Sequence, residues 1–103
     1  MSTIVVRYRP RDADADANVR LIEDVFADLA DRSPDGIRYT VWRLADGAFL
    51  HVAELDGDDN PLHRSPAFQR FLAGIDARCE PDHRPIGQPA IRLGDYPATS
   101  NTV

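Results

Sequence analysis

Two segments rich in β-branched and aromatic residues flank the dipeptide Asp46-Gly47. Residues 37–45 read IRYTVWRLA, and residues 48–55 read AFLHVAEL. Such runs are typical of strands, and Asp-Gly between them is typical of a two-residue type I′ turn. The pattern therefore predicts a β-hairpin with Asp46 and Gly47 at its tip.

The two faces of this hairpin follow from counting residues outward from the turn. The count places Trp42 opposite His51. Because side chains alternate across a strand, one face would carry Thr40, Trp42, Leu44, Phe49, His51, Ala53 and Leu55. The other face would carry Ile37, Tyr39, Val41, Leu50 and Val52. Both rows are largely apolar, whereas a sheet with one face in water shows a polar row. We therefore expect both faces to be covered.

The rest of the chain alternates between strand and helix patterns. Residues 3–9 (TIVVRYR) predict a strand that ends at Pro10. Apolar residues then recur at helical spacing at Val19, Ile22, Val25, Phe26 and Leu29. Ser65-Pro66 predicts the N-cap and first residue of a second helix, with an apolar face of Phe68, Phe71, Leu72, Ile75 and Cys79. Residues 86–93 predict a marginal strand because they contain Pro89. Residues 94–103 are expected to form a tail, with Tyr96 as its anchor.

The order of these elements is β-α-β-β-α-β, which predicts a ferredoxin-like α+β domain over residues 1–93. Both helices would then cover one face of a four-stranded antiparallel sheet. The other apolar face needs a ligand or a second subunit, because large exposed apolar patches are rare on soluble monomers. A twofold homodimer with the two sheets face to face is the simplest arrangement.

Composition narrows the classes of function. The chain has 103 residues, which suit one domain, and a formal net charge of −5, which argues against nonspecific nucleic-acid binding. No apolar run is long enough for a membrane span. The single cysteine, Cys79, cannot form an internal disulfide and suits a reducing cytoplasm. No phosphate-binding loop or Cys/His metal spacing is present, so we expect no cofactor and no metal.

Three stretches carry a resemblance to a known family: residues 5–9 (VVRYR), the hairpin through Tyr39 and Trp42, and NPL followed by SPAFQRF at residues 60–62 and 65–71. Together they resemble the dimeric α+β barrel superfamily, especially its antibiotic biosynthesis monooxygenase-like domains. The resemblance implies a homodimer with a pocket between sheet and helices in each subunit. The superfamily also includes haem-degrading enzymes, but the strand at residues 3–9 lacks the asparagine of that branch.

For a cofactor-independent monooxygenase of this kind, we expect a flat aromatic or polyketide-like substrate. His51 would take a phenolic proton, Trp42 would stack on the ring and Arg38 would stabilise the anion. Tyr39 has the opposite parity, and it replaces Trp42 and His51 if the helix-side face holds the pocket. The alternative is a non-catalytic dimeric module that binds a small ligand or is structural, with Trp42 and His51 packed at the dimer interface.

Overall fold

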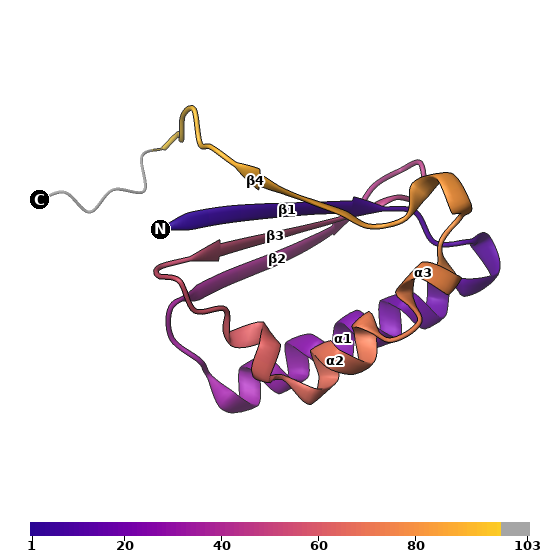
Figure 1. The fold of residues 1–103 in the computed structure, drawn as a ribbon, viewed down its shortest axis with the longest axis horizontal. Helices are drawn as coiled ribbons and strands as arrows, with labels where there is room; N and C mark the ends of the chain where they lie inside the picture. The colour runs from indigo at the N-terminus through magenta and orange to yellow at the C-terminus, as the bar shows by residue number, and fades with distance from the viewer. Residues whose placement is uncertain (98–103) are drawn as a thin grey trace, which may run out of the picture.

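A computed structural model of the chain describes residues 1–97, in which helices cover one face of a four-stranded antiparallel sheet (Figure 1). The strands lie in the order β2-β3-β1-β4. Their bounds are β1 (Ser2–Tyr8), β2 (Ile37–Arg43), β3 (Phe49–Leu55) and β4 (Ile86–Ala90). The helices are α1 (Ala15–Arg32), α2 (Pro66–Leu72) and α3 (Ile75–Arg78), with short 3-10 turns η1 (Asp12–Asp14), η2 (Pro61–Arg64) and η3 (Pro81–His83). The predicted ferredoxin-like arrangement is confirmed.

The turn of the β2–β3 hairpin is one residue longer than predicted. Its loop consists of Ala45, Asp46 and Gly47, because the Leu44 N–H donates to the Ala48 carbonyl at 2.8 Å. The Gly47 N–H donates to the Leu44 carbonyl at 3.0 Å, and Gly47 has a φ of +90°. The three-residue loop therefore ends in a left-handed residue, a conformation that glycine adopts without steric cost. The predicted two-residue type I′ turn is therefore wrong.

The extra loop residue changes which side chains share a face. His51 pairs with Val41, and Tyr39 pairs with Ala53. Since a one-residue slip moves a side chain to the opposite face of a sheet, Tyr39 and His51 both face the helices. Trp42 pairs with Leu50 on the other face. The prediction that Trp42 and His51 are cross-strand neighbours is wrong for this reason.

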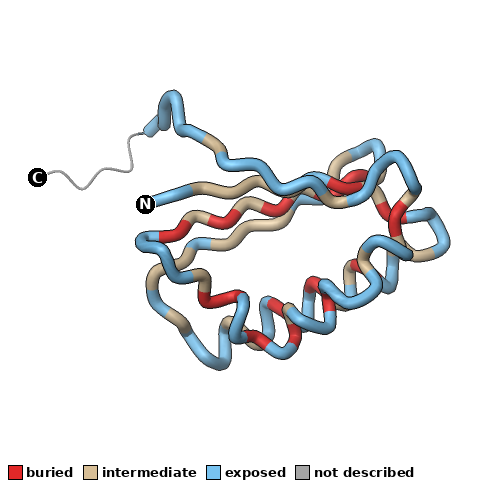
Figure 2. The backbone as a smooth tube through the Cα atoms, viewed as in Figure 1, coloured by how far each residue is buried: buried red, intermediate tan, exposed pale blue. Residues whose placement is uncertain are grey.

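The hydrophobic core lies between the sheet and the helices, and the buried residues belong to both layers (Figure 2). β1 and β3 contribute Tyr8 and Phe49, whose rings stack with centroids 5.7 Å apart. Fully or nearly fully buried residues from the helical layer complete it: Ile22, Val25, Leu62, Ala67, Phe71 and Cys79. Cys79 is thus a small buried side chain, as the sequence predicts.

The second predicted helix is two short helices. Ser65 caps α2 as expected, with its Oγ accepting the Phe68 N–H at 3.1 Å. Gly74 has a φ of +77° and separates α2 from α3. The predicted continuous apolar face from Phe68 to Cys79 is therefore interrupted, and Leu72 is exposed.

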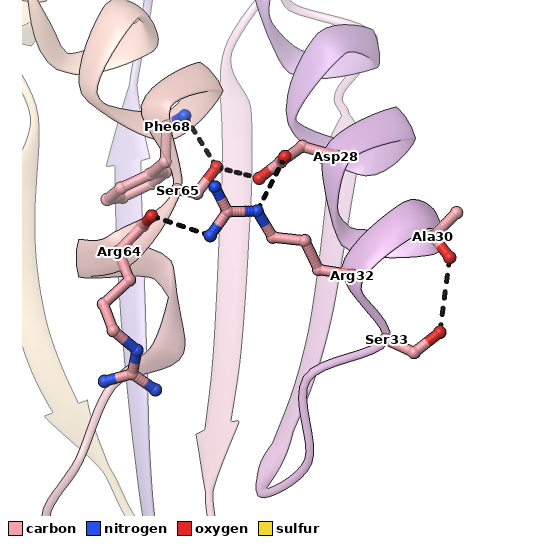
Figure 3. Close-up of polar contacts among 7 residues, drawn as sticks. All are labelled: Asp28, Ala30, Arg32, Ser33, Arg64, Ser65 and Phe68. Atoms are coloured by element: carbon pink, nitrogen blue, oxygen red, sulfur yellow. Dashed lines mark hydrogen bonds and ion pairs between the residues drawn. The ribbon is translucent and has the colours of Figure 1, made fainter.

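A polar cluster ties α1 to the start of α2 (Figure 3). The Asp28 carboxylate accepts the Ser65 hydroxyl at 2.6 Å and the Arg32 Nε at 3.0 Å. Arg32 also donates to the Arg64 carbonyl at 2.9 Å. Because charge-assisted hydrogen bonds are stronger than neutral ones, the cluster keeps α1 and α2 together as one layer.

The face of the sheet opposite the helices is covered by no other element of residues 1–97 (Figure 1). Its apolar residues are Val5, Leu50, Val52, Trp42 and Ile86, of which Trp42 is 57% exposed, and Arg7 lies between Leu50 and Ile86. We call these five residues the outer apolar patch.

Residues 91–97 contain no helix or strand, and Tyr96 is exposed, so the prediction that it anchors the tail is wrong. The rest of the predicted tail, residues 98–103, lies outside the described part of the chain. Among the described helices, none has the length and apolar character needed to cross a membrane.

Candidate functional site

A partly open cavity of about 130 Å³ lies between the sheet and the helical layer. An engineered apolar cavity of roughly 150 Å³ binds benzene, so the space suits one aromatic ring. Most of the wall is apolar, and the polar side chains in it are those of Tyr8, Tyr39, His51 and Asn60. The apolar lining comes from the strands and helices together: Ile4, Val6, Ala53, Leu62, Phe68, Phe71, Leu72, Ile75 and Pro85.

Three of these polar side chains belong to a continuous line of hydrogen bonds. The Tyr39 hydroxyl lies 2.5 Å from His51 Nδ1, and the Tyr8 hydroxyl lies 2.7 Å from His51 Nε2. Asn18 Nδ2 donates to the Tyr8 hydroxyl at 2.9 Å, and Arg78 Nε donates to Asn18 Oδ1 at 3.3 Å. We call Arg78, Asn18, Tyr8, His51 and Tyr39 the hydrogen-bond relay.

The fold brings the relay together from five elements, β1, α1, β2, β3 and α3. Tyr8 ends β1 on the same parity as Ile4 and Val6, so its ring points toward the helices. His51 and Tyr39 occupy the same face of the β2–β3 ladder. Tyr39 is further held by stacking on Phe26, with ring centroids 5.3 Å apart.

Sequence reasoning missed Asn18, Tyr8 and Arg78. A signal for Asn18 is present in the sequence, since it lies four and seven residues before Ile22 and Val25 on the buried stripe of α1. The structure leaves Asn18 0% exposed. A polar residue at a position on an apolar stripe indicates a buried hydrogen-bonding role. The role of Arg78 carries no such local signal, because it depends on the break at Gly74.

Burial controls the charge of the site. His51 is 5% exposed, and burial lowers its pKa to about 4, so its imidazole is neutral at pH 7. Burial also raises the pKa of both Tyr8 and Tyr39, which keeps their hydroxyls protonated. The relay end nearest the cavity is therefore uncharged.

These properties change the role expected for His51. An imidazole whose conjugate acid has a pKa of about 4 is a weak base toward a phenol, whose pKa is roughly 10. Both ring nitrogens already contact tyrosine hydroxyls. Tyr39 therefore stands between His51 and any molecule that approaches from the Nδ1 side.

Arg38 and Trp42 do not reach the cavity. They line a separate open depression on the opposite face of the sheet, together with Val52, Glu54 and Arg92. Arg38 Nε lies 4.0 Å from Glu54 Oε1, and the Arg38 side chain is largely exposed. Of the four predicted site residues, only Tyr39 and His51 lie at the cavity.

Metal-binding side chains are dispersed in the described part of the chain. Residues 1–97 contain no group of three or more His, Cys, Asp or Glu side chains placed to hold a metal ion. Burial raises the pKa of the Cys79 thiol, and its side chain is 1% exposed.

The architecture is shared with solved structures that include an antibiotic biosynthesis monooxygenase. No family model and no curated protein matches the chain. PA3566 from Pseudomonas aeruginosa is 17% identical, with a TM-score of 0.69 over 90% of this chain and 94% of that one. Rv0793 from Mycobacterium tuberculosis is 20% identical, with a TM-score of 0.66 over 92% and 97% of the two chains.

A mutant of SnoaB, a cofactor-independent oxygenase from Streptomyces nogalater, is also similar. It is 19% identical, with a TM-score of 0.66 over 94% of this chain and 97% of that one. The chain thus has the fold of antibiotic biosynthesis monooxygenase-like domains, as the sequence resemblance implies.

Proposed function

We propose that the chain is a cofactor-independent monooxygenase that acts on a small aromatic or polyketide-like molecule bound in the cavity. The observation that carries this proposal is the contact between the Tyr39 hydroxyl and the His51 imidazole at the wall of an apolar, ring-sized cavity. The fold shared with a cofactor-independent oxygenase supports it further.

In this proposal, Tyr39 contacts an oxygen atom of the substrate, and His51 holds Tyr39 from behind. Phe68, Phe71 and Leu62 would contact the ring and exclude water from it. A water-poor site strengthens the interaction between a developing oxyanion and a fixed hydroxyl group. Larger substrates would extend through the open side of the cavity.

The reaction needs no reductant when the substrate supplies the electrons. An electron-rich ring that carries a CH₂ group can lose four electrons as CH₂ becomes C=O. One atom of O₂ becomes the carbonyl oxygen, and the other leaves as water with the two hydrogens. The ring enters as a phenolate that has already lost its proton to water, and the contribution of the protein is to stabilise this electron-rich anion as it reacts with O₂.

A second copy of the chain is the proposed cover for the outer apolar patch. Acidic and basic side chains occur at both ends of this face, with Arg7 and Asp46 at one end and Arg38 and Glu54 at the other. A patch with both signs of charge at each end can pair with itself about a twofold axis, as an isologous interface requires.

Oxygen uptake tests the proposed activity. Purified protein, in buffer with a metal chelator and without flavin, is mixed with electron-rich phenols that bear a ring CH₂ group, and O₂ consumption and ¹⁸O incorporation are measured. Ala53→Leu should abolish uptake by filling the cavity. Ala27→Leu makes the same change on the exposed face of α1 and should retain full activity.

The result that contradicts the proposal is phenol binding that Ala53→Leu blocks, with O₂ uptake no faster than in a blank without protein. That outcome supports the second candidate function, a non-catalytic ligand-binding module. The weak basicity of His51 favours this candidate. So does the hydrogen bonding of the described residues, among which no buried side-chain nitrogen or oxygen lacks a partner.

A further inference from the structure

Arg78 is fixed in place by the end of α2. Its Nη2 donates to the Phe71 carbonyl at 2.6 Å, and its Nη1 donates to the Ala73 carbonyl at 3.0 Å. The guanidinium also lies over the Phe71 ring, 5.4 Å from its centroid. The carbonyls at a helix C-terminus have no partner within the helix, so Arg78 satisfies them and is held at the same time. In its remaining side-chain hydrogen bond, the Arg78 Nε donates to Asn18 Oδ1.

An arginine side chain can only donate hydrogen bonds, and this determines the orientation of Asn18. The oxygen of the carboxamide must face Arg78, so the NH₂ group faces Tyr8. Asn18 is 0% exposed, and a buried amide finds its partners within the protein. The Tyr8 oxygen therefore accepts a hydrogen bond from Asn18.

The proton of the Tyr8 hydroxyl then determines the protonation of His51. Tyr8 is 2% exposed, and its hydroxyl contacts Asn18 and His51 Nε2. Since the Asn18 NH₂ group cannot accept, Tyr8 donates its proton to Nε2. A neutral imidazole carries one N–H, which must be on Nδ1 and must point at the Tyr39 oxygen.

We infer that Arg78 and Asn18 are positioning residues that hold neutral His51 as the Nδ1–H tautomer, so that the Tyr39 hydroxyl donates its own proton toward the cavity. The ligand class that fits is an aromatic molecule with an acceptor oxygen, such as a phenolate or an aromatic ketone. The choice of ligand rests on the proposed function of the cavity. The tautomer rests on the hydrogen-bond relay and on the burial of the His51 imidazole, which keeps it neutral.

Long-range ¹H–¹⁵N spectra of the histidine rings test the tautomer at pH 7, with His51→Gln used to assign the His51 signals. In the unaltered protein, Nδ1 should be protonated and Nε2 should not. Asn18→Asp changes one atom of the side chain and should invert this result. The carboxylate accepts from both Arg78 and Tyr8, so the Tyr8 oxygen is left to accept from Nε2–H.

Arg78→Met provides a second, independent variant. It removes the donor, keeps an unbranched side chain and frees the Asn18 amide to turn over, so a mixture of both tautomers is expected. A protein that shows Nε2–H without any substitution overturns the inference. Asn18→Asp that folds and retains Nδ1–H overturns it as well.

Binding of acetophenone and ethylbenzene tests the direction of the Tyr39 hydroxyl, because the two probes differ mainly in one acceptor oxygen. The unaltered protein should prefer acetophenone by about fivefold, the usual value of one net hydrogen bond. Asn18→Asp should remove this preference while ethylbenzene binds as before. If the unaltered protein and Asn18→Asp prefer acetophenone to the same degree, the inference that the Tyr39 hydroxyl donates toward the cavity is contradicted. A normal tautomer with no O₂ uptake would instead contradict the monooxygenase proposal only.

Discussion

The Tyr39 hydroxyl reaches His51 Nδ1 along a diagonal of the β2–β3 ladder, because the residue opposite Tyr39 is Ala53 and the residue opposite His51 is Val41. Diagonal neighbours on one face are within reach of an aromatic side chain. The small Ala53 leaves the space next to Tyr39 open, and this space is part of the cavity. The same pairing thus creates both the polar contact and the room for a ligand beside it.

The two tyrosines of the relay should differ in their importance for stability. Tyr8→Phe leaves His51 Nε2 and Asn18 Nδ2 buried without a partner, and a buried polar group without a partner costs about 1–3 kcal/mol. Tyr39→Phe removes a hydroxyl at the cavity wall, where water can replace it, and should cost less than about 1 kcal/mol. Urea unfolding of both variants measures the difference. Equal losses of free energy of unfolding would show that the hydrogen bonds of Tyr8 stabilise the fold no more than the hydrogen bond of Tyr39 does.

The stability of the fold should decrease as the pH falls from 7 to 5. The folded-state pKa of His51, about 4, is below its ordinary value of 6.5. On acidification, the unfolded chain therefore takes up a proton at this histidine before the folded chain does. The stabilisation is complete above about pH 6.5 and is lost progressively toward pH 4, with a loss of about 2 kcal/mol between pH 7 and pH 5.

Urea unfolding at pH 7, 6 and 5 measures this pH dependence. His51→Gln is the matched control, since it removes the titrating group while all carboxylates remain. The variant should lose about 2 kcal/mol less than the unaltered protein over the same range. Parallel curves for the two proteins would mean that the imidazole does not stay neutral in the folded state.

Replacement of Gly47, the glycine of the hairpin turn, should lower the free energy of unfolding. Gly47→Ala forces a side chain onto a residue with a φ of +90°, and the left-handed conformation costs a residue other than glycine about 1–2 kcal/mol. Gly57→Ala is the control, because Gly57 lies in a loop without a positive φ and with open space around it. That change should be neutral or slightly stabilising. A Gly47→Ala variant as stable as Gly57→Ala would contradict the described turn.

The proposed homodimer predicts a mass in solution near twice the 11.5 kDa of one chain. Trp42→Asp places a charge in the outer apolar patch and should shift the protein to monomer, as measured by light scattering. Leu72→Asp makes a comparable change at an exposed apolar residue of the helical layer and should leave the mass unchanged. If the unaltered protein is a monomer at micromolar concentration, the proposed homodimer is excluded.

The order and type of the elements could be predicted from the sequence because apolar periodicity and capping residues are local signals. Val19 to Leu29 shows the helical spacing by itself, and Ser65 caps α2 as its sequence context indicates. The residue pairing between β2 and β3 could not be predicted from such local signals. Asp46-Gly47 is compatible with a two-residue and a three-residue loop, and only packing against α1 and α2 selects between the two faces.

Only half of the candidate site could be predicted from the sequence. Tyr39 and His51 are visible as hairpin residues, but their contact depends on the pairing of β2 with β3. A two-residue loop predicts Arg38 and Trp42 on the same face as His51, whereas the observed pairing places them on the opposite face. The contribution of Arg78 depends on the left-handed Gly74, which directs α3 away from the line of α2, and this tertiary consequence has no counterpart in a periodic pattern.

The three-residue loop at Ala45–Gly47 has a consequence for how this protein can change in evolution. Substitutions along β2 and β3 alter one side chain at a time, but a deletion of one loop residue would exchange the interior and exterior side chains of the whole of β2, because β3 is held in place by β1. Tyr39 would turn outward and Trp42 would turn inward, against helices shaped for neither. The length of this loop is therefore under a stricter constraint than the identity of Ala45 within it.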